Sequence, residues 1–252
     1  MEVVLDQGRI EATMLAGVRI IAFLVIAPPF SYNGIPARIK AMLAIGLALA
    51  VSQQVTDGYE SPGTAGYITA LILELVVGAA LGFLVLVVFS AIQAAGSLID
   101  LFGGFSLAQG FDPQSMVNGA QFTRLFQMTA LALLFASDGY QLIISGLART
   151  FNALPIGGGI DLSSPVEAIT GSVTNMFLAA VQIAGPLIVI LFLADVGLGL
   201  LTRVAPALNA FALGFPLKIL VTLLLAATLF VALPRIVSTL VDDAVRLVMG
   251  VG

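Results

Sequence analysis

The sequence predicts an all-α fold for an integral membrane protein built from helical hairpins and from helices broken by proline and glycine. Of the 252 residues, 60% are hydrophobic and only 10% are charged. A soluble domain carries roughly 25% charged residues, so this chain lacks the polar side chains for a water-covered surface. The mean hydropathy of +1.11 agrees. Several apolar runs also have about the length that a helix needs to cross a bilayer.

The first helix is expected over Glu11–Phe30, an apolar run interrupted only by Arg19. Pro28 and Pro29 end it, because neither residue has an N–H and each biases its predecessor away from helix. Acidic residues dominate Met1–Glu11, which is the wrong charge for a signal peptide. We therefore expect the first helix to be retained.

Two short pieces are expected next. The turn SYNGIPARIK over 31–40 leads into the apolar run Ala41–Val51, which is too short to cross lipid by itself. Ser52–Gly66 is expected to be a polar connector, because Asp57-Gly58 and Ser61-Pro62-Gly63 are turn signals.

Tyr67–Ala95 is the longest apolar helix candidate. Gly78 and Gly82 form a GxxxG pattern, which lets a second helix approach closely. Ordinary helix packing is the weightier interpretation of this pattern, and docking of another subunit is the alternative. Glu74 places a charge inside the same helix.

The stretch Gln93–Arg124 is less apolar than a membrane-spanning segment and more apolar than a soluble loop, because glycines are interspersed in it with Phe, Met and Asp. Irregular backbone cannot face lipid, since its N–H and C=O groups would go unpaired. We therefore expect this stretch to be buried in, or to project into, the middle of a helical membrane assembly. Gly103–Phe111 is its irregular part. A helix then resumes with Asp112 as N-cap and Pro113 as first residue, and continues to Phe135.

The C-terminal half is expected to be helical with two interruptions. An amphipathic helix covers 140–154, and the loop PIGGGIDLSS covers 155–164. A capping box at Ser164–Glu167 starts the next helix, which continues to Leu193 with a kink at Gly185-Pro186. Asp195–Pro206 is a polar interval.

Beyond that interval, Phe211–Leu233 is apolar, and an amphipathic helix over Ile236–Met249 follows Pro234-Arg235.

Four charges interrupt the oily runs, at Arg19, Glu74, Asp195 and Lys218. Short, broken helices with such charges suit a chain that is surrounded by partner helices. Glu74 and Lys218 are expected to pair with one another or with partner subunits. Asp195 and Arg203 lie about two helical turns apart, too far for a direct pair, and structural pairing outweighs ion coupling for both.

Composition excludes most catalytic chemistry. The chain has no His and no Cys, so Ser–His and Cys–His nucleophiles are excluded, and it carries neither HExxH nor GxxxxGK[ST]. We expect no enzymatic activity, cofactor or metal. The net charge of −4 and the lack of a basic cluster argue against nucleic acid.

One block of the sequence is specific. Leu193–Ile219, LADVGLGLLTRVAPALNAFALGFPLKI, resembles the signature of the FliR family of flagellar export-gate proteins, which is related to the SctT proteins of type III injectisomes. The block contains Asp195, Arg203, Pro206, Asn209, Pro216 and Lys218. Other segments that resemble the family follow its order and include Arg19, Glu74, Gly78, Gly82, Asp100, Gly104-Phe105 and Asp112-Pro113.

The resemblance implies a core subunit of the bacterial flagellar type III export gate in the cytoplasmic (inner) membrane, at the flagellar basal body. The implied partners are FliP-like and FliQ-like subunits in a hetero-oligomeric gate, together with FlhB, FlhA and unfolded flagellar export substrates. A FliP-like part would cover roughly 1–165 and a FliQ-like hairpin roughly 166–252.

The resemblance also implies that a loop helps to plug the pore, and the matching positions are 103–121. The expected plug residues are Gly103, Gly104, Phe105, Phe111, Asp112, Pro113 and Met116. Phe and Met on a glycine-rich backbone supply apolar bulk that can move aside. The alternative is that these side chains anchor a static loop to neighbouring helices.

Two other functions remain open. One is the SctT role in an injectisome, although the GFPLK sequence at 214–218 favours the flagellar one. The other is a stand-alone secondary transporter, which broken helices and intramembrane charges would suit, but no inverted repeat is evident.

Overall fold

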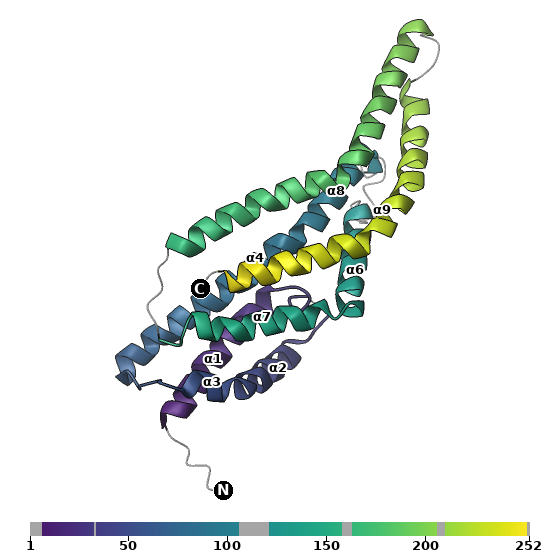
Figure 1. The fold of residues 1–252 in the computed structure, drawn as a ribbon. Coiled ribbons are helices and arrows are strands. Elements are labelled where there is room, and N and C mark those ends of the chain that lie inside the picture. Colours follow the sequence, from purple (N-terminus) through teal and green to yellow (C-terminus); the bar gives the residue numbers. More distant parts are fainter. Residues whose placement is uncertain (1–6, 33, 106–120, 158–162, 206–209, 251–252) are drawn as a thin grey trace. The chain divides into compact units, whose positions relative to one another are not determined.

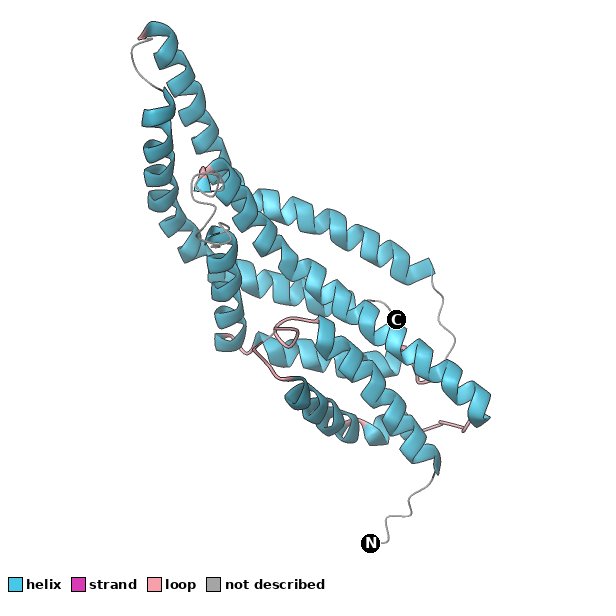
Figure 2. Cartoon of the chain, turned by 180° about the vertical axis from the view of Figure 1, so that it is seen from behind, coloured by secondary structure: helices cyan, strands magenta, loops and turns pink. Residues whose placement is uncertain are grey.

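A computed structural model describes residues 7–32, 34–105, 121–157, 163–205 and 210–250. Within these ranges all regular structure is helical (Figure 2), which confirms the all-α class. The helices in chain order are α1 (Gln7–Ile26), α2 (Ala37–Ala50), α3 (Ser52–Thr56), α4 (Gly63–Phe102), α6 (Gln121–Ala136), α7 (Gly139–Ala153), α8 (Ser163–Val204) and α9 (Ala210–Met249).

Three of the described helices are long and apolar enough to cross a membrane. The qualifying segments are Gly63–Phe102, Ile169–Val204 and Leu213–Met249. The bent pair α6 and α7 makes a fourth candidate if the two count as one span. The prediction of a membrane protein with broken helices is therefore confirmed.

The chain forms two compact units. Unit 1 contains residues 1–88, 134–173 and 240–252, and unit 2 contains residues 89–133 and 174–239. Each unit takes residues from both sides of position 165, where the sequence suggested a division into two parts. That division stays a prediction.

Unit 1 is organised around α1, which packs against α2 and α3 (Figure 1). Its core includes Leu15, Phe23 and Leu24 of α1, all fully buried. Leu81 of α4 and Ile143 of α7 are buried in the same unit. The buried side chains of α1 thus form part of the core of unit 1.

Unit 2 contains the C-terminal part of α4, most of α6, the C-terminal part of α8 and the N-terminal part of α9. The last turns of α8 and the first turns of α9 lie side by side in both views (Figures 1 and 2). Ile92 and Ile99 of α4, Phe126 of α6, Leu191 of α8 and Leu233 of α9 are buried.

Several predicted boundaries are wrong. The polar connector Ser52–Gly66 contains the short helix α3, and α4 already begins at Gly63. The polar interval after Asp195 is helical as far as Val204. Asp195, Gly197 and Gly199 lower the helix propensity of the second segment, but tertiary context overrides so weak a preference.

The two segments that the sequence separates at Pro234-Arg235 belong to one helix, because α9 continues through both Pro216 and Pro234. α8 is also one helix across Pro186, and the kink expected at Gly185-Pro186 stays a prediction. A proline costs a soluble helix about 3 kcal/mol or more. In membrane helices, neighbouring helices and local adjustments re-satisfy the freed carbonyl groups.

Candidate functional site

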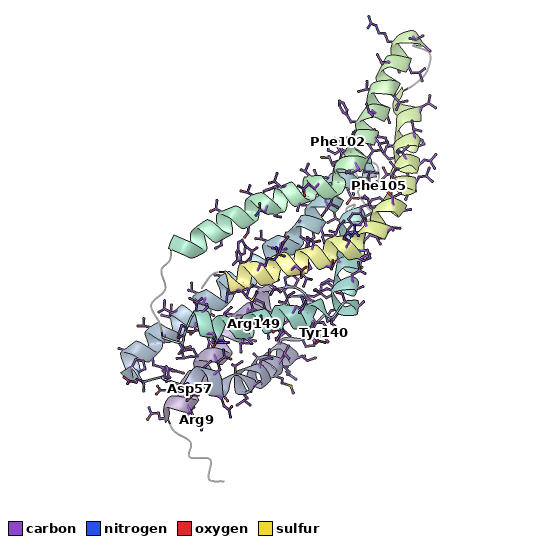
Figure 3. The ribbon with its side chains drawn as sticks, in the orientation of Figure 1. Arg9, Asp57, Phe102, Phe105, Tyr140 and Arg149 are labelled. Atoms are coloured by element: carbon purple, nitrogen blue, oxygen red, sulfur yellow. The ribbon has the colours of Figure 1, made fainter. Side chains whose placement is uncertain are left out.

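The C-terminal end of α4 is where the described chain enters the predicted plug segment. α4 ends at Phe102, so the predicted start of the irregular part at Gly103 coincides with the helix end. Figure 3 labels Phe102 and Phe105 at this end. Gly104 has a φ of +83°, a left-handed conformation that favours glycine.

Both glycines at this end lie against α9. A Cβ on Gly103 would lie 2.8 Å from the hydroxyl oxygen of Thr222, and one on Gly104 would lie 3.5 Å from the ring of Phe215. Gly103 and Gly104 are buried. A larger side chain at Gly103 would therefore push α4 and α9 apart.

Phe105 joins a chain of edge-to-face aromatic contacts. Its ring centroid lies 5.2 Å from that of Phe122, which lies 6.1 Å from Phe126. Phe126 in turn lies 5.5 Å from Phe230 of α9. Such pairs contribute about 0.5–1.5 kcal/mol beyond the burial of their area. For Phe105 this geometry is what the anchoring alternative requires, whereas its role in gating stays a prediction.

Asp100 lies in the last turn of α4 and is 3% exposed. Its Oδ1 accepts the N–H of Phe122 at 2.9 Å, and its Oδ2 accepts the N–H of Thr123 at 3.0 Å. The hydroxyl of Thr123 also donates to Oδ2, at 2.9 Å. Asp100 is thus buried, and its donors come from the first described turn of α6.

The remaining predicted residues of the plug segment lie outside the described residues. These are Phe111, Asp112, Pro113 and Met116, and Pro206 and Asn209 of the family-like block lie outside them too. The predicted helix start at Pro113 falls in the same gap, and α6 is described from Gln121 onward.

Arg19 and Glu74 form a buried ion pair in unit 1. Nε of Arg19 donates to Oε2 of Glu74 at 2.5 Å, and Nη2 donates to Oε1 at 3.0 Å. Their exposed fractions are 1% and 3%. This fork geometry matches the carboxylate with two parallel hydrogen bonds. The partner of Glu74 is therefore Arg19, and the alternative pairing of Glu74 with Lys218 is wrong.

Arg19 also contacts the C-terminal end of α7. Its Nη2 donates to the carbonyl oxygen of Leu154 at 2.9 Å, and the Phe151 ring centroid lies 4.4 Å from its Cζ. A cation beside the last carbonyl groups of a helix is stabilising. One guanidinium thus ties α1, α4 and α7 together.

The GxxxG pattern of α4 is used inside the chain. A Cβ on Gly78 would overlap the backbone carbonyl oxygen of Arg19, and one on Gly82 would lie 3.0 Å from that of Phe23. Gly78 and Gly82 therefore let α4 lie directly on α1. The geometry fits ordinary helix packing, the weightier of the two predicted interpretations.

Lys218 and Asp195 form a second ion pair, between α9 and α8, with Nζ 2.7 Å from Oδ1. The side chains are 21% and 45% exposed, so the pair lies at a surface of unit 2. Arg203, eight residues beyond Asp195, is exposed. Asp195 thus pairs within the chain. The intramembrane charges that suggested a transporter, Glu74, Asp195 and Lys218, all have partners in the same chain.

Exchanging the two charges is expected to restore function that each single reversal removes. D195K or K218D alone puts two like charges together, whereas the double variant D195K/K218D re-forms the pair. Exposed pairs couple by about 0.2–1 kcal/mol, so the rescue should be partial. The measurement is the swarm diameter of a strain that carries only this chain. A D195K/R203D variant is the control, and equal diameters for both double variants would contradict the pairing.

The end of unit 1 around Glu11 is polar. Ser61 donates its hydroxyl proton to Oε2 of Glu11 at 2.6 Å, and Gln7 donates to Oε1 at 2.9 Å. Hydrogen bonds from Ser61 and then from Gln7 hold the pKa of Glu11 below its usual value. Burial, and then the charge of Glu11, raise the pKa of Tyr59. This end of the unit therefore keeps a charged carboxylate near neutral pH.

Sequence reasoning missed the partners of these groups. Thr123 and Leu154 contribute backbone or hydroxyl groups that no motif marks. The one available signal was that Asp100 stands in an apolar helix and so needs donors nearby.

Several known proteins are similar to this chain over most of its length. Residues 10–244 match the family described as bacterial export proteins, family 1. The chain is 34% identical over 211 residues to the flagellar biosynthetic protein FliR of Escherichia coli (strain K12), covering 84% of this chain and 81% of that protein. It is 28% identical over 252 residues to FliR of Bacillus subtilis (strain 168), covering 96% of each.

The chain is also similar to a protein that is not named FliR. The surface presentation of antigens protein SpaR of Shigella sonnei is 29% identical over 199 residues, covering 77% of this chain and 76% of that protein. The resemblance carried by Leu193–Ile219 is confirmed by matches that span nearly the whole sequence. This chain belongs to the FliR family of bacterial export proteins.

Proposed function

We propose that this chain is a non-enzymatic core subunit of the flagellar protein export gate in the bacterial cytoplasmic membrane, at the flagellar basal body. The observation that carries the proposal is the family match over residues 10–244, with named flagellar relatives. The three candidate membrane spans among the described helices support a membrane location.

The gate partners in this proposal are FliP-like and FliQ-like subunits, with FlhB and FlhA attached or nearby. In the single chain, α8 exposes large apolar side chains, among them Phe177, Val189 and Phe192. The partly exposed Asp195–Lys218 pair also involves α8. A charge pair is costly against lipid and is accommodated better by protein, which supports a partner helix at this surface. The hairpin α8–α9 would be the FliQ-like part.

The proposed conduit carries unfolded flagellar proteins, and the segment 103–121 helps to plug it. Support comes from composition, since a glycine-rich segment with Phe and Met is suited to an apolar seal that can rearrange. The described residues Gly103–Phe105 show that the segment leaves α4 from a buried position beside α9. Lipid cannot surround irregular backbone there.

Deletion of Gly103–Gly110 tests the plug. The variant is expected to assemble with its partners but to make the membrane leaky to ions, because apolar bulk is removed from the closed pore. The measurement is ion conductance of the purified assembly in vesicles. A deletion of 106–110 spares the contacts of Gly103 and Phe105, and a deletion of Gly157–Gly159 in the second loop is the matched control. An assembled, non-leaky complex after both plug deletions would contradict the plug.

The similarity to SpaR keeps the injectisome role as a second candidate. Copurification separates the two: a tagged version of this chain should recover flagellar FliP-like and FliQ-like chains. Recovery of the corresponding injectisome chains in their place would support the second role, and recovery alone with a bound small solute would support a transporter.

A further inference from the structure

We propose that Asp100 is a positioning residue that locks the first turn of α6 to the last turns of α4, and so sets the spacing between the two ends of the segment 106–120. The functional part of this inference rests on the proposed function, because that segment belongs to the proposed plug. The inference concerns the two anchor points, which lie within unit 2.

The carboxylate is fully engaged with donors from α6. Both oxygens accept backbone N–H groups, from Phe122 and Thr123, and the Thr123 hydroxyl adds a third bond. Among the described residues, neither ion pair involves Asp100. Its carboxylate is therefore stabilised by two backbone N–H groups and one hydroxyl in the first described turn of α6, and hydrogen bonds to an ionised acceptor are stronger than neutral ones.

Asp100 supplies a side-chain acceptor to the first described turn of α6 from another helix. Its carboxylate lies 22 residues before Phe122 in the sequence. Loss of this carboxylate would remove the acceptor of the buried N–H of Phe122 and of the part-buried N–H of Thr123, and a buried donor without an acceptor is destabilising.

Gly96 brings the two backbones together at the same point. It lies four residues before Asp100 and hence on the same face of α4. A Cβ there would lie 2.6 Å from the Cα of Thr123. The close approach of α4 and α6 at Gly96 is thus a second contact, separate from the hydrogen bonds of Asp100. It brings Asp100 within hydrogen-bonding distance of the N–H groups of α6.

The two sides of the segment also meet through Phe105 and Phe122, whose rings are in edge-to-face contact. Phe105 is the last described residue before the segment, and Phe122 lies in the first turn after it. A change in the spacing of α4 and α6 at this point therefore acts on both the Phe105–Phe122 ring contact and the bonds of Asp100.

The test measures this spacing in the full chain, purified in its assembly with partner subunits. The chain has no Cys, so cysteines at the exposed positions Leu101 of α4 and Leu125 of α6 accept spin labels selectively. Pulsed electron paramagnetic resonance then gives the distance distribution between α4 and α6. D100A is expected to broaden this distribution and to raise the ion leak of the assembly above wild type.

Three further variants separate positioning from general damage. D100N keeps a neutral acceptor and is expected to lie between wild type and D100A in both measurements. T123V removes only the hydroxyl bond and should leave the distribution close to wild type. D242A removes an exposed carboxylate of α9 and should change neither.

An unchanged distance distribution in D100A would overturn the inference. A broadened distribution without ion leak would support the positioning role and count against the proposed plug, so the two failures are distinguishable. If D100A does not assemble, D100N decides: an intermediate broadening supports the inference, and a distribution identical to wild type overturns it.

Discussion

Replacing Arg19 by Met is expected to destabilise the chain by about 3–5 kcal/mol, because it leaves Glu74 buried without its counter-ion. Glu74 is only 3% exposed, so its carboxylate would stay buried. The carbonyl oxygen of Leu154 also loses its donor. Since Arg19 joins three helices, the loss should be felt across unit 1.

The measurement is the temperature at which the detergent-solubilised protein loses half of its folded population, together with its steady-state level in cells. E74Q keeps a hydrogen-bond acceptor and should be milder than R19M. The double variant R19M/E74M removes both charges and should recover part of the loss, because an apolar pair needs no desolvation of ions. A double variant less stable than R19M would contradict the assignment of an unpaired charge as the cause.

The existence of these buried charges was predictable from sequence, but their partners were not. An Arg or Glu inside an apolar run must find a partner, and Arg19, Glu74 and Asp195 stand out for that reason. Periodicity tells which face of a helix a residue occupies, not which helix covers that face. Arg19 and Glu74 are 55 residues apart in sequence, so only the packing of α4 on α1 could join them.

Local rules succeeded where local forces decide. The adjacent prolines at 28 and 29 follow the end of α1 at Ile26, and Gly103 follows the end of α4. They failed at Pro234, where the flanking turns of a long membrane helix outweigh one missing hydrogen bond. The N-cap rule searches just before a helix, so it could not find Asp100.

The same limit of sequence analysis applies to Leu193–Ile219, the block that resembles the FliR family. Lys218 and Asp195 both stood out as charges, yet their pairing required the hairpin of α8 and α9. Residues such as Phe111 and Met116 lie outside the described ranges, so their sealing role stays a prediction. Residue type alone identified the charged candidates, but the tertiary packing of the helices determines which of them form pairs.

Gly78→Ala is expected to destabilise unit 1 by about 1–3 kcal/mol or more, the usual cost of overpacking. The added methyl would overlap the carbonyl oxygen of Arg19, which is backbone and cannot rotate away, and would lie 2.9 Å from the Cβ of Ala22. α4 would have to move off α1, which also strains the Arg19–Glu74 pair.

Gly46→Ala is the matched control, because Gly46 also lies inside a helix but has nothing within 4 Å of its would-be Cβ. Alanine there should stabilise α2 by roughly 0.5–1 kcal/mol, since glycine loses more backbone entropy on folding. Melting of the two variants beside wild type therefore gives opposite shifts if α4 lies directly on α1. A loss of the same size in both would mean that helix propensity or expression, rather than close packing at Gly78, sets the stability.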